Sequence, residues 1–248
     1  MGFFVREMFK AKGDTLKGKT FILSGSGNVA QYATEQVNKQ GGKVVALSDS
    51  KGVLVDEAGI TDKKLAEVMD IKNSRRTSLR EYMEKFPDAK WTDFSEQYDD
   101  EEDKCNPIWQ LKCDVALPCA TQNELNAAGA QALVDNGVTI VAEGANMPST
   151  PGAIEVLRKA KVAFGPGKAS NAGGVATSGL EMAQNSQRMA WTAKKVEEEL
   201  DGIMTRIHAD CVSTSKQYST DDYVDYPLGA NITGFLKVAE AMLAQGLA

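Results

Sequence analysis

The sequence predicts an α/β fold: a doubly wound, mostly parallel sheet with helices on both faces, followed by a helical C-terminal part. Three observations predict it. Short runs rich in β-branched residues alternate with helical stretches, and a glycine-rich turn joins the first such run to a helix. Beyond Asn171 the chain reads as wholly helical.

The alternation of strands and helices extends through the first two thirds of the chain. A helix predicted over residues 28–39 carries Ala30, Ala33 and Val37 on one face, at the spacing of an amphipathic helix, and glycines follow its end. A second helix is predicted over residues 61–72, where a threonine occupies the cap position. The predicted strands are residues 20–24, 43–48, 114–117, 138–142 and 162–164, with a short extended piece ending at residue 56.

Two further helices are predicted in the C-terminal part. The first covers residues 194–211, and its stripe of apolar residues at 3–4 spacing predicts one buried face. A polar loop is expected over residues 213–226, before the last helix. The stripe of the first helix is Val196, Leu200, Ile203, Ile207 and Cys211, and the residues expected to face inward on the last are Ile232, Phe235, Leu236, Ala239 and Leu243.

Composition excludes several classes of protein. The formal net charge of -6 over 248 residues disfavours a general nucleic-acid-binding role. No apolar run approaches the roughly 20 residues that a membrane-spanning helix needs, so no membrane association is expected. The acidic block at residues 99–103 is predicted to be a solvated loop.

The cysteines show neither metal-ligand nor disulfide patterning. The four cysteines have no CxxC spacing, and His208 is the only histidine, so we expect no metal site and no disulfide framework. A reducing, cytoplasmic compartment is the simplest interpretation.

The glycine-rich turn carries the most specific motif in the chain. Gly25, Gly27 and Ala30 form a G-x-G-x-x-A pattern directly after the first strand and at the start of a helix. The first glycine permits a tight turn, the second permits close approach of a pyrophosphate, and free N–H groups at the helix start attract the anion. The alternative is an ordinary glycine turn, but the strand–turn–helix context favours a dinucleotide coenzyme.

The end of the second strand bears on the choice of coenzyme. An acid there, as at Asp49, usually binds the ribose hydroxyls of NAD. However, Ser50 follows it, and the next helix ends with the cations Lys72, Arg75 and Arg76. If these cations fold beside Ser50, they can bind the 2′-phosphate of NADP. The alternative is an exposed basic helix end that is favoured by the helix dipole.

Three later segments combine polar residues with turn formers after predicted strands: residues 118–124, 143–148 and 165–175. Ligands of open α/β sheets bind at the carboxyl ends of the strands. Together with the glycine motif, these segments predict one continuous coenzyme crevice.

At this point the chain resembles a known family. SGSGNVAQYA, ALSDSKG, DVALPCATQNEL, VAEGANMPST and PGKASNAGGVATSGLEMAQNS look like consecutive signatures of the NADP-linked glutamate dehydrogenases, in the Glu/Leu/Phe/Val dehydrogenase family, and the resemblance covers residues 16–247. It implies a modified Rossmann domain from a two-domain enzyme, a homohexamer in its full-length form, that reversibly converts 2-oxoglutarate, ammonium and NADPH to glutamate. NADP is expected in preference to NAD.

The resemblance also implies a role for each matching residue. The pyrophosphate is expected at Gly25, Gly27, Asn28 and Val29, and the adenosine ribose with its phosphate at Asp49, Ser50, Lys72 and Arg75. Thr121 and Gln122 are expected near the nicotinamide half, and Asn146 at its ribose. Asn171, Val175 and Ser178 are expected to face the substrate. Ser178 favours glutamate over apolar amino acids, because a hydroxyl that binds a charged group discriminates strongly against apolar analogues.

The resemblance further implies a substrate domain before Met1, which would supply the catalytic lysine, the catalytic aspartate and the lysines that bind the substrate carboxylates. We therefore expect no catalytic residue in this chain and no turnover by it alone; Lys168 does not match the catalytic lysine. Residues 1–17 are expected to be the end of an entry helix and a linker, residues 18–222 the NAD(P)-binding domain, and residues 223–248 a helix returning to the substrate domain. The alternative function is a stand-alone, non-catalytic NADP-binding or assembly module.

Overall fold

The computed structural model describes residues 1–94 and 105–246. Within them, seven strands form one mixed sheet in the order β4-β3-β2-β1-β5-β6-β7. The adjacent strands β2, β1, β5, β6 and β7 pair in parallel. Strand β3 pairs antiparallel with both β2 and β4. The strands are β1 (Thr20–Leu23), β2 (Lys43–Ser48), β3 (Gly52–Val55), β4 (Lys90–Asp93), β5 (Val115–Leu117), β6 (Ile140–Ala142) and β7 (Ala163–Gly165).

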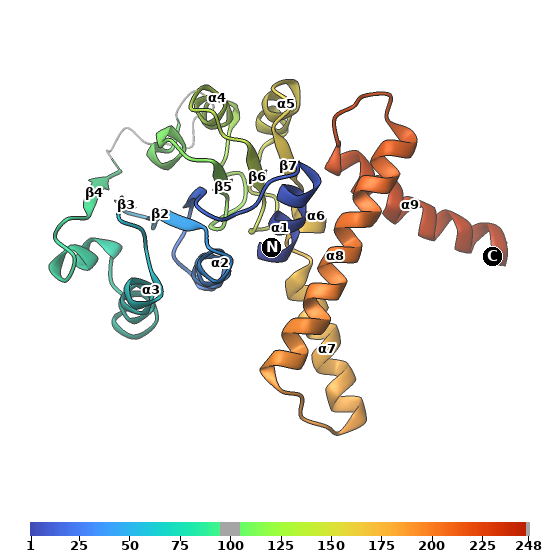
Figure 1. The fold of residues 1–248 in the computed structure, drawn as a ribbon, viewed down its shortest axis with the longest axis horizontal. Helices are drawn as coiled ribbons and strands as arrows, with labels where there is room; N and C mark the ends of the chain where they lie inside the picture. Colours follow the sequence, from blue (N-terminus) through green and yellow to red (C-terminus); the bar gives the residue numbers. More distant parts are fainter. Residues whose placement is uncertain (95–104, 247–248) are drawn as a thin grey trace.

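Helices cover both faces of this sheet, as the predicted fold class requires (Figure 1). On one face, a first core cluster joins the sheet to α1, α2, α3 and α8. On the other face, a second core cluster joins the sheet to η3, α4 and α5. The helices of these layers are α1 (Gly2–Ala11), α2 (Asn28–Lys39), α3 (Asp62–Met69), α4 (Ala127–Asp135), α5 (Pro151–Lys159) and α8 (Ala193–Tyr218), with the 3-10 helices η2 (Leu79–Glu84) and η3 (Pro107–Gln110).

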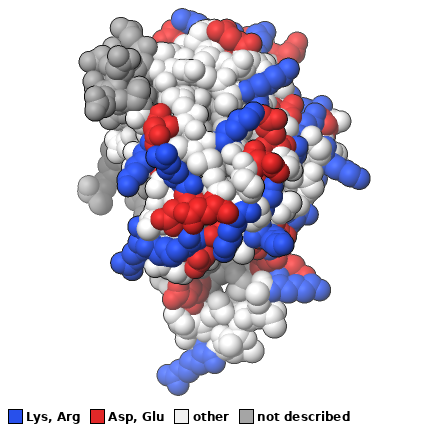
Figure 2. Space-filling model, turned by 90° about the vertical axis from the view of Figure 1, so that its left-hand side faces the viewer, with Lys and Arg blue, Asp and Glu red and all other residues white. Residues whose placement is uncertain are grey.

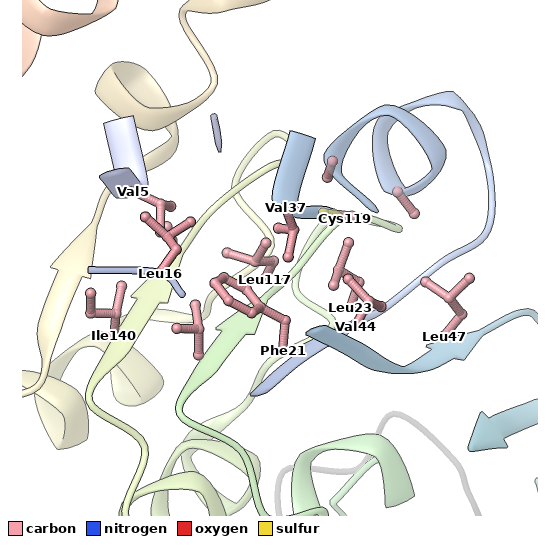
Figure 3. Packing of buried hydrophobic residues seen from close by; sticks show 14 of the residues in the cluster. Val5, Leu16, Phe21, Leu23, Val37, Val44, Leu47, Leu117, Cys119 and Ile140 are labelled. Carbon is pink, nitrogen blue, oxygen red and sulfur yellow. The ribbon is translucent and has the colours of Figure 1, made fainter. Parts of the chain in front are cut away.

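The first core cluster is built by alternating strand residues that meet apolar helix faces. Phe21 and Leu23 of β1 point to the same face, because side chains alternate along a strand, and they pack with Val37 of α2 (Figure 3). Helix α1 belongs to this cluster as well, with Phe4 and Val5 buried in it. The first ten residues therefore form an integral part of the core.

The predicted strands and helices of the sheet region are confirmed, and three features were not predicted. Strand β4 lies in a stretch for which no strand was predicted, and α1, expected to be the end of an entry helix, is deeply buried. In addition, the helix predicted to run to Lys72 is α-helical only to Met69 and continues as the π-helix η1 (Asp70–Arg75). The acidic block at residues 99–103 lies outside the described residues.

The C-terminal part is helical, as predicted, but one boundary and two faces differ. Helix α8 continues to Tyr218, so the first part of the loop predicted over residues 213–226 is helical. Its buried line is Met204, His208 and Cys211, rotated from the predicted stripe, because α1 and α9 pack against that side. The remaining helices are α6 (Gly167–Ser170), α7 (Gly173–Gln187) and α9 (Tyr226–Gln245).

The predicted inward face of the last helix is confirmed only in part, because Ile232, Leu236 and Ala239 are half-buried and the other two residues are exposed. Phe235 and Leu243 are 67% and 86% exposed, and only the first turn of α9 is buried, at Tyr226 and Gly229. The helix extends away from the sheet (Figure 1), so within the described chain there is no surface for its later turns to pack against. No helix of the described residues is long and apolar enough to cross a membrane.

Candidate functional site

The glycine turn after β1 is held between the ends of two other strands. Gly25 has a φ of 80°, and its N–H donates to the Ser48 hydroxyl at the end of β2, at 2.9 Å. A Cβ on Gly25 would lie 3.1 Å from the Cα atom of Ala120, after β5. Both the conformation and the close approach therefore require glycine here.

Two buried serine hydroxyls link these strand ends. The Ser24 hydroxyl accepts the N–H of Cys119 at 2.8 Å, so β1 and β5 are joined beyond their last ladder bond, and Ser48 does the same for β1 and β2. The sequence did not assign these roles. Their only signal was that each serine is the polar residue that ends an apolar strand.

Helix α2 begins at this turn with an open N-terminus. Its cap residue is Gly27, and the N–H groups of Asn28 and Val29 have no acceptor among the described residues. Both residues are exposed, and a Cβ on Gly27 would meet no atom within 4 Å. Free N–H groups and the positive end of the helix dipole attract an anion. The four residues predicted to bind a pyrophosphate are thus adjacent, with space in front of them.

Asp49, after β2, does not face the solvent. One carboxylate oxygen accepts the N–H of Lys51 at 2.8 Å, and the other accepts the N–H of Leu79 at 2.8 Å and the hydroxyl of Ser78 at 3.2 Å. Its side chain is only 4% exposed. Ser50, the next residue, is exposed. The structure therefore separates two neighbours that the resemblance assigned to one ribose.

The basic end of η1 is close to Asp49, but its cations differ in their surroundings. The Lys72 ammonium group donates to the Thr77 carbonyl at 2.9 Å and lies 3.6 Å from the Asp49 carboxylate. Arg75 instead forms ion pairs with three carboxylates, those of Glu67, Asp70 and Glu81. On this side of the molecule, basic and acidic side chains alternate over the surface (Figure 2).

The loops after β5 and β6 are paired with each other. The N–H of Asn123 donates to the Met147 carbonyl, and the N–H of Leu125 donates to the Pro148 carbonyl, both at 2.9 Å. The carboxylate of Glu124 accepts the N–H of Ala120 at 2.9 Å, and burial raises the pKa of this carboxyl group. The adjoining Thr121 and Gln122 are exposed on this fixed loop.

Glu143, after β6, fixes the next pair of loops. Its carboxylate accepts the N–H of Ser149 at 3.2 Å and that of Gly167 at 2.5 Å, and Glu143 is buried. Above it, the side-chain amide of Asn171 donates to the Asn146 side chain at 3.1 Å. The predicted nicotinamide-ribose residue and the first predicted substrate residue are therefore in direct contact.

The other two predicted substrate residues lie on α7. Val175 is 80% exposed, and Ser178 is exposed one turn further along. The Ser178 hydroxyl donates to the Gly174 carbonyl at 3.3 Å, a long bond that leaves its lone pairs free. Lys168 lies apart from them and donates to Asn231 of α9 at 2.5 Å.

These segments share one edge of the sheet. The glycine turn, Asp49 and the three later segments each follow one of the parallel strands β1, β2, β5, β6 and β7, whose carboxyl ends meet at the same edge. The residues predicted to form one continuous coenzyme crevice therefore all follow strands at the same edge of the sheet.

Comparison with known proteins identifies the family. The glutamate/leucine/phenylalanine/valine dehydrogenase family matches residues 1–246 of the chain. The chain belongs to this family. It is 51% identical over 248 residues to the NADP-specific glutamate dehydrogenase of Haemophilus influenzae, and 49% identical over 247 residues to the NAD(P)-specific glutamate dehydrogenase of Xylanibacter ruminicola.

The similarity extends to solved structures of the family. The chain superimposes on the glutamate dehydrogenase of Plasmodium falciparum with a TM-score of 0.91 and 38% identity. That match covers 100% of this chain and 50% of the other chain, and the two relatives by sequence are each matched over 99% of this chain and 52% of their own length. The chain therefore spans about half the length of the family members that it matches.

Proposed function

We propose that this chain is the coenzyme-binding half of an NADP-linked glutamate dehydrogenase. The observation that carries the proposal is the open N-terminus of α2, which presents the N–H groups of Asn28 and Val29 beside the Gly25 turn at the carboxyl edge of the sheet. Such a helix end neutralises part of the charge of a pyrophosphate. Family membership supports NADP, because relatives with NADP-specific and NAD(P)-specific names match along the whole chain.

The rest of the coenzyme is proposed to extend along the strand ends in both directions from the pyrophosphate. The adenosine ribose lies toward Ser50, after β2, and Lys72 of η1, and the nicotinamide half lies toward Thr121 and Gln122 after β5. Asn146 is proposed to donate to the nicotinamide ribose, since Asn171 fixes the orientation of its side chain. This arrangement assigns binding and orientation to the chain.

The substrate side of the site is proposed to be α7. Ser178 presents a hydroxyl with free lone pairs, and a rotation about its side chain frees the proton to donate to a carboxylate of 2-oxoglutarate or glutamate. The acid and base that move protons during reductive amination are proposed to lie in a substrate-binding part outside these 248 residues. The complete enzyme is proposed to be a cytoplasmic homohexamer. Positioning of the nicotinamide against the substrate requires both parts.

Calorimetric titration of the purified chain with NADPH, and separately with NADH, tests the proposal. We expect saturable binding of NADPH that is tighter than binding of NADH, together with no oxidation of NADPH when 2-oxoglutarate and ammonium are added. A chain that binds neither coenzyme would refute the proposal. Turnover by the chain alone would show that its own residues supply the acid and base.

A further inference from the structure

The three cations at the end of η1 differ in how far nearby carboxylates compensate their charge. Arg75 is surrounded by Glu67, Asp70 and Glu81, at 3.0 Å from each of the last two. Arg76, the next residue, is exposed and forms no ion pair within the residues that the structure describes. Phosphate binding requires a cation that is not already paired with carboxylates, and of these two adjacent arginines only Arg76 meets that requirement.

Arg75 stabilises the fold by compensating the charge of a buried carboxylate. Its partner Glu67 is 8% exposed and is also paired with Lys85, so this carboxylate depends on both cations for compensation. Breaking a buried ion pair leaves an uncompensated charge and is strongly destabilising. The network joins α3, η1 and η2, and a phosphate that recruited Arg75 would have to dismantle it.

The backbone of Arg76 is held in an unusual conformation. Its φ is 55° and its ψ is 39°, in the left-handed region, which is sterically unfavourable for a residue with a side chain. The following residues fix it there: the N–H of Thr77 donates to the Ile71 carbonyl at 3.1 Å, and the Thr77 carbonyl accepts from Lys72 at 2.9 Å. The strained residue is therefore anchored on its C-terminal side.

Asp49 fixes the same segment to the sheet. Through Ser78 and Leu79 it connects the end of β2 with the residues that follow Arg76. Because the carboxylate is buried and all its contacts are within the protein, it is not available to ribose hydroxyls, and its charge is partly compensated by Lys72. An acid at this position would otherwise repel a 2′-phosphate. The ion pair with Lys72 reduces that repulsion.

We propose that Arg76, with Lys72 and Ser50, binds the 2′-phosphate of NADP, that Arg75 is structural, and that Asp49 is a positioning residue for the segment that carries Arg76. This inference rests on the proposed function and specifies the residues that give it NADP preference. Arginine suits the task, since its planar group binds phosphate oxygens with two hydrogen bonds.

The adjacent arginines provide a matched pair of variants for testing the proposal. Arg76→Ala is expected to weaken NADPH binding about tenfold to hundredfold, as the loss of a charge-assisted contact does, with NADH binding and the melting temperature unchanged. Arg75→Ala, which removes the same charge one residue away, is expected to lower the melting temperature and leave the ratio of the two affinities unchanged. A selective loss of NADPH in Arg75→Ala but not in Arg76→Ala would overturn the proposal.

Two further variants separate the remaining explanations. Lys51→Ala removes another exposed cation beside Ser50 and is expected to affect NADPH less than Arg76→Ala; the opposite order would overturn the assignment. Asp49→Asn is expected to weaken NADPH and spare NADH, whereas an aspartate that binds the ribose would show a loss of NADH affinity. If the unmodified chain binds neither coenzyme, the proposed function itself fails. If it prefers NADPH and Arg76→Ala retains that preference, only this inference fails.

Discussion

Two regions of the molecule differ in how completely they are packed. One is the sheet with its covering helices, and the other consists of the C-terminal helices α7 and α9. In the sheet region, large side chains such as Trp109 and Phe21 are fully buried in two clusters. Over the whole length of α7 the only buried residue is Gly173, and α9 buries only Tyr226 and Gly229. Both helices carry exposed apolar residues, among them Val175, Met182, Phe235, Val238, Met242 and Leu243. One region has an internally complete core, and the other presents apolar surface that the described residues do not cover.

The same substitution in the two regions gives the largest expected contrast. Phe21→Ala in β1 is expected to lower the free energy of unfolding by about 3–5 kcal/mol, because a fully buried aromatic ring leaves a cavity. Phe235→Ala in α9, at a side chain 67% exposed, is expected to change it by less than about 0.5 kcal/mol. Urea unfolding of both variants measures the difference. Similar losses at the two sites would mean that α9 is packed in solution.

Within the sheet region, the two glycines of the turn separate packing from binding. Gly25→Ala is expected to lower the free energy of unfolding by about 1–3 kcal/mol and to weaken both coenzymes, because the methyl group meets Ala120 and φ is positive. Gly27→Ala has open space and a φ of -79°, so stability is expected to be retained while coenzyme affinity falls. Unfolding curves and NADPH titrations of both variants test this, and retained affinity in Gly27→Ala would argue against a pyrophosphate at this position.

The contact between the two regions is expected to respond to pH through His208. Burial lowers the pKa of this histidine from its ordinary value of 6.5; its ring lies 3.0 Å from the Tyr226 hydroxyl and packs on Phe4, with Glu7 raising and Lys10 lowering the pKa from α1. The unfolded chain binds a proton below pH 6.5 that the folded chain does not, so stability is expected to fall as pH drops through 6.5 until the folded-state pKa is reached.

Thermal unfolding of wild type and His208→Gln between pH 8 and pH 5 isolates this contribution from that of the carboxylates. The variant is expected to show a flatter dependence than wild type over the upper part of this range. Parallel curves would show that His208 titrates alike in the folded and unfolded chains.

The smallest effect on stability is expected for the exposed turns of α9. Replacing Phe235 and Leu243 together by serine is expected to leave the melting temperature nearly unchanged and to reduce concentration-dependent self-association, since exposed apolar patches drive association. Sedimentation velocity over a range of concentrations measures this. Replacement of two exposed lysines of α8, Lys194 and Lys216, by serine serves as the control. An equal reduction there would show that general surface solubility, not this helix, determines association.

The comparison of the two regions also explains which parts of the structure could be predicted from the sequence. All strands except β4, together with the helix Asn28–Lys39, were predicted, because their periodic patterns meet partners within the chain. The inward face of α9 was predicted from a pattern of the same kind and was wrong at Phe235 and Leu243, since periodicity shows which side of a helix is apolar and not what covers it. The buried line of α8 was shifted toward Met204 and His208 for a related reason: its partner α1 is remote in sequence.

In the candidate site, motifs predicted neighbourhoods but not individual contacts. The glycine turn and the strand-end loops lie on one edge as expected, because parallel strands place their carboxyl ends together. The orientation of Asp49 depends on Ser78 and Leu79, about thirty residues later, and no local pattern contains it. Likewise, the difference between Arg75 and Arg76 arises from carboxylates on three separate elements.

The π-helix η1 has a consequence for how coenzyme preference can change within such a chain. A π-helical turn accommodates one more residue than an α-helical turn, so deletion of a single residue between Asp70 and Arg75 would restore regular α-helix. Successive residues of an α-helix are rotated by about 100°. The deletion would therefore turn the whole arginine pair to another side of the helix without replacing either arginine. If the arginine pair sets coenzyme preference as proposed, a change in chain length here would alter that preference without a change in residue type.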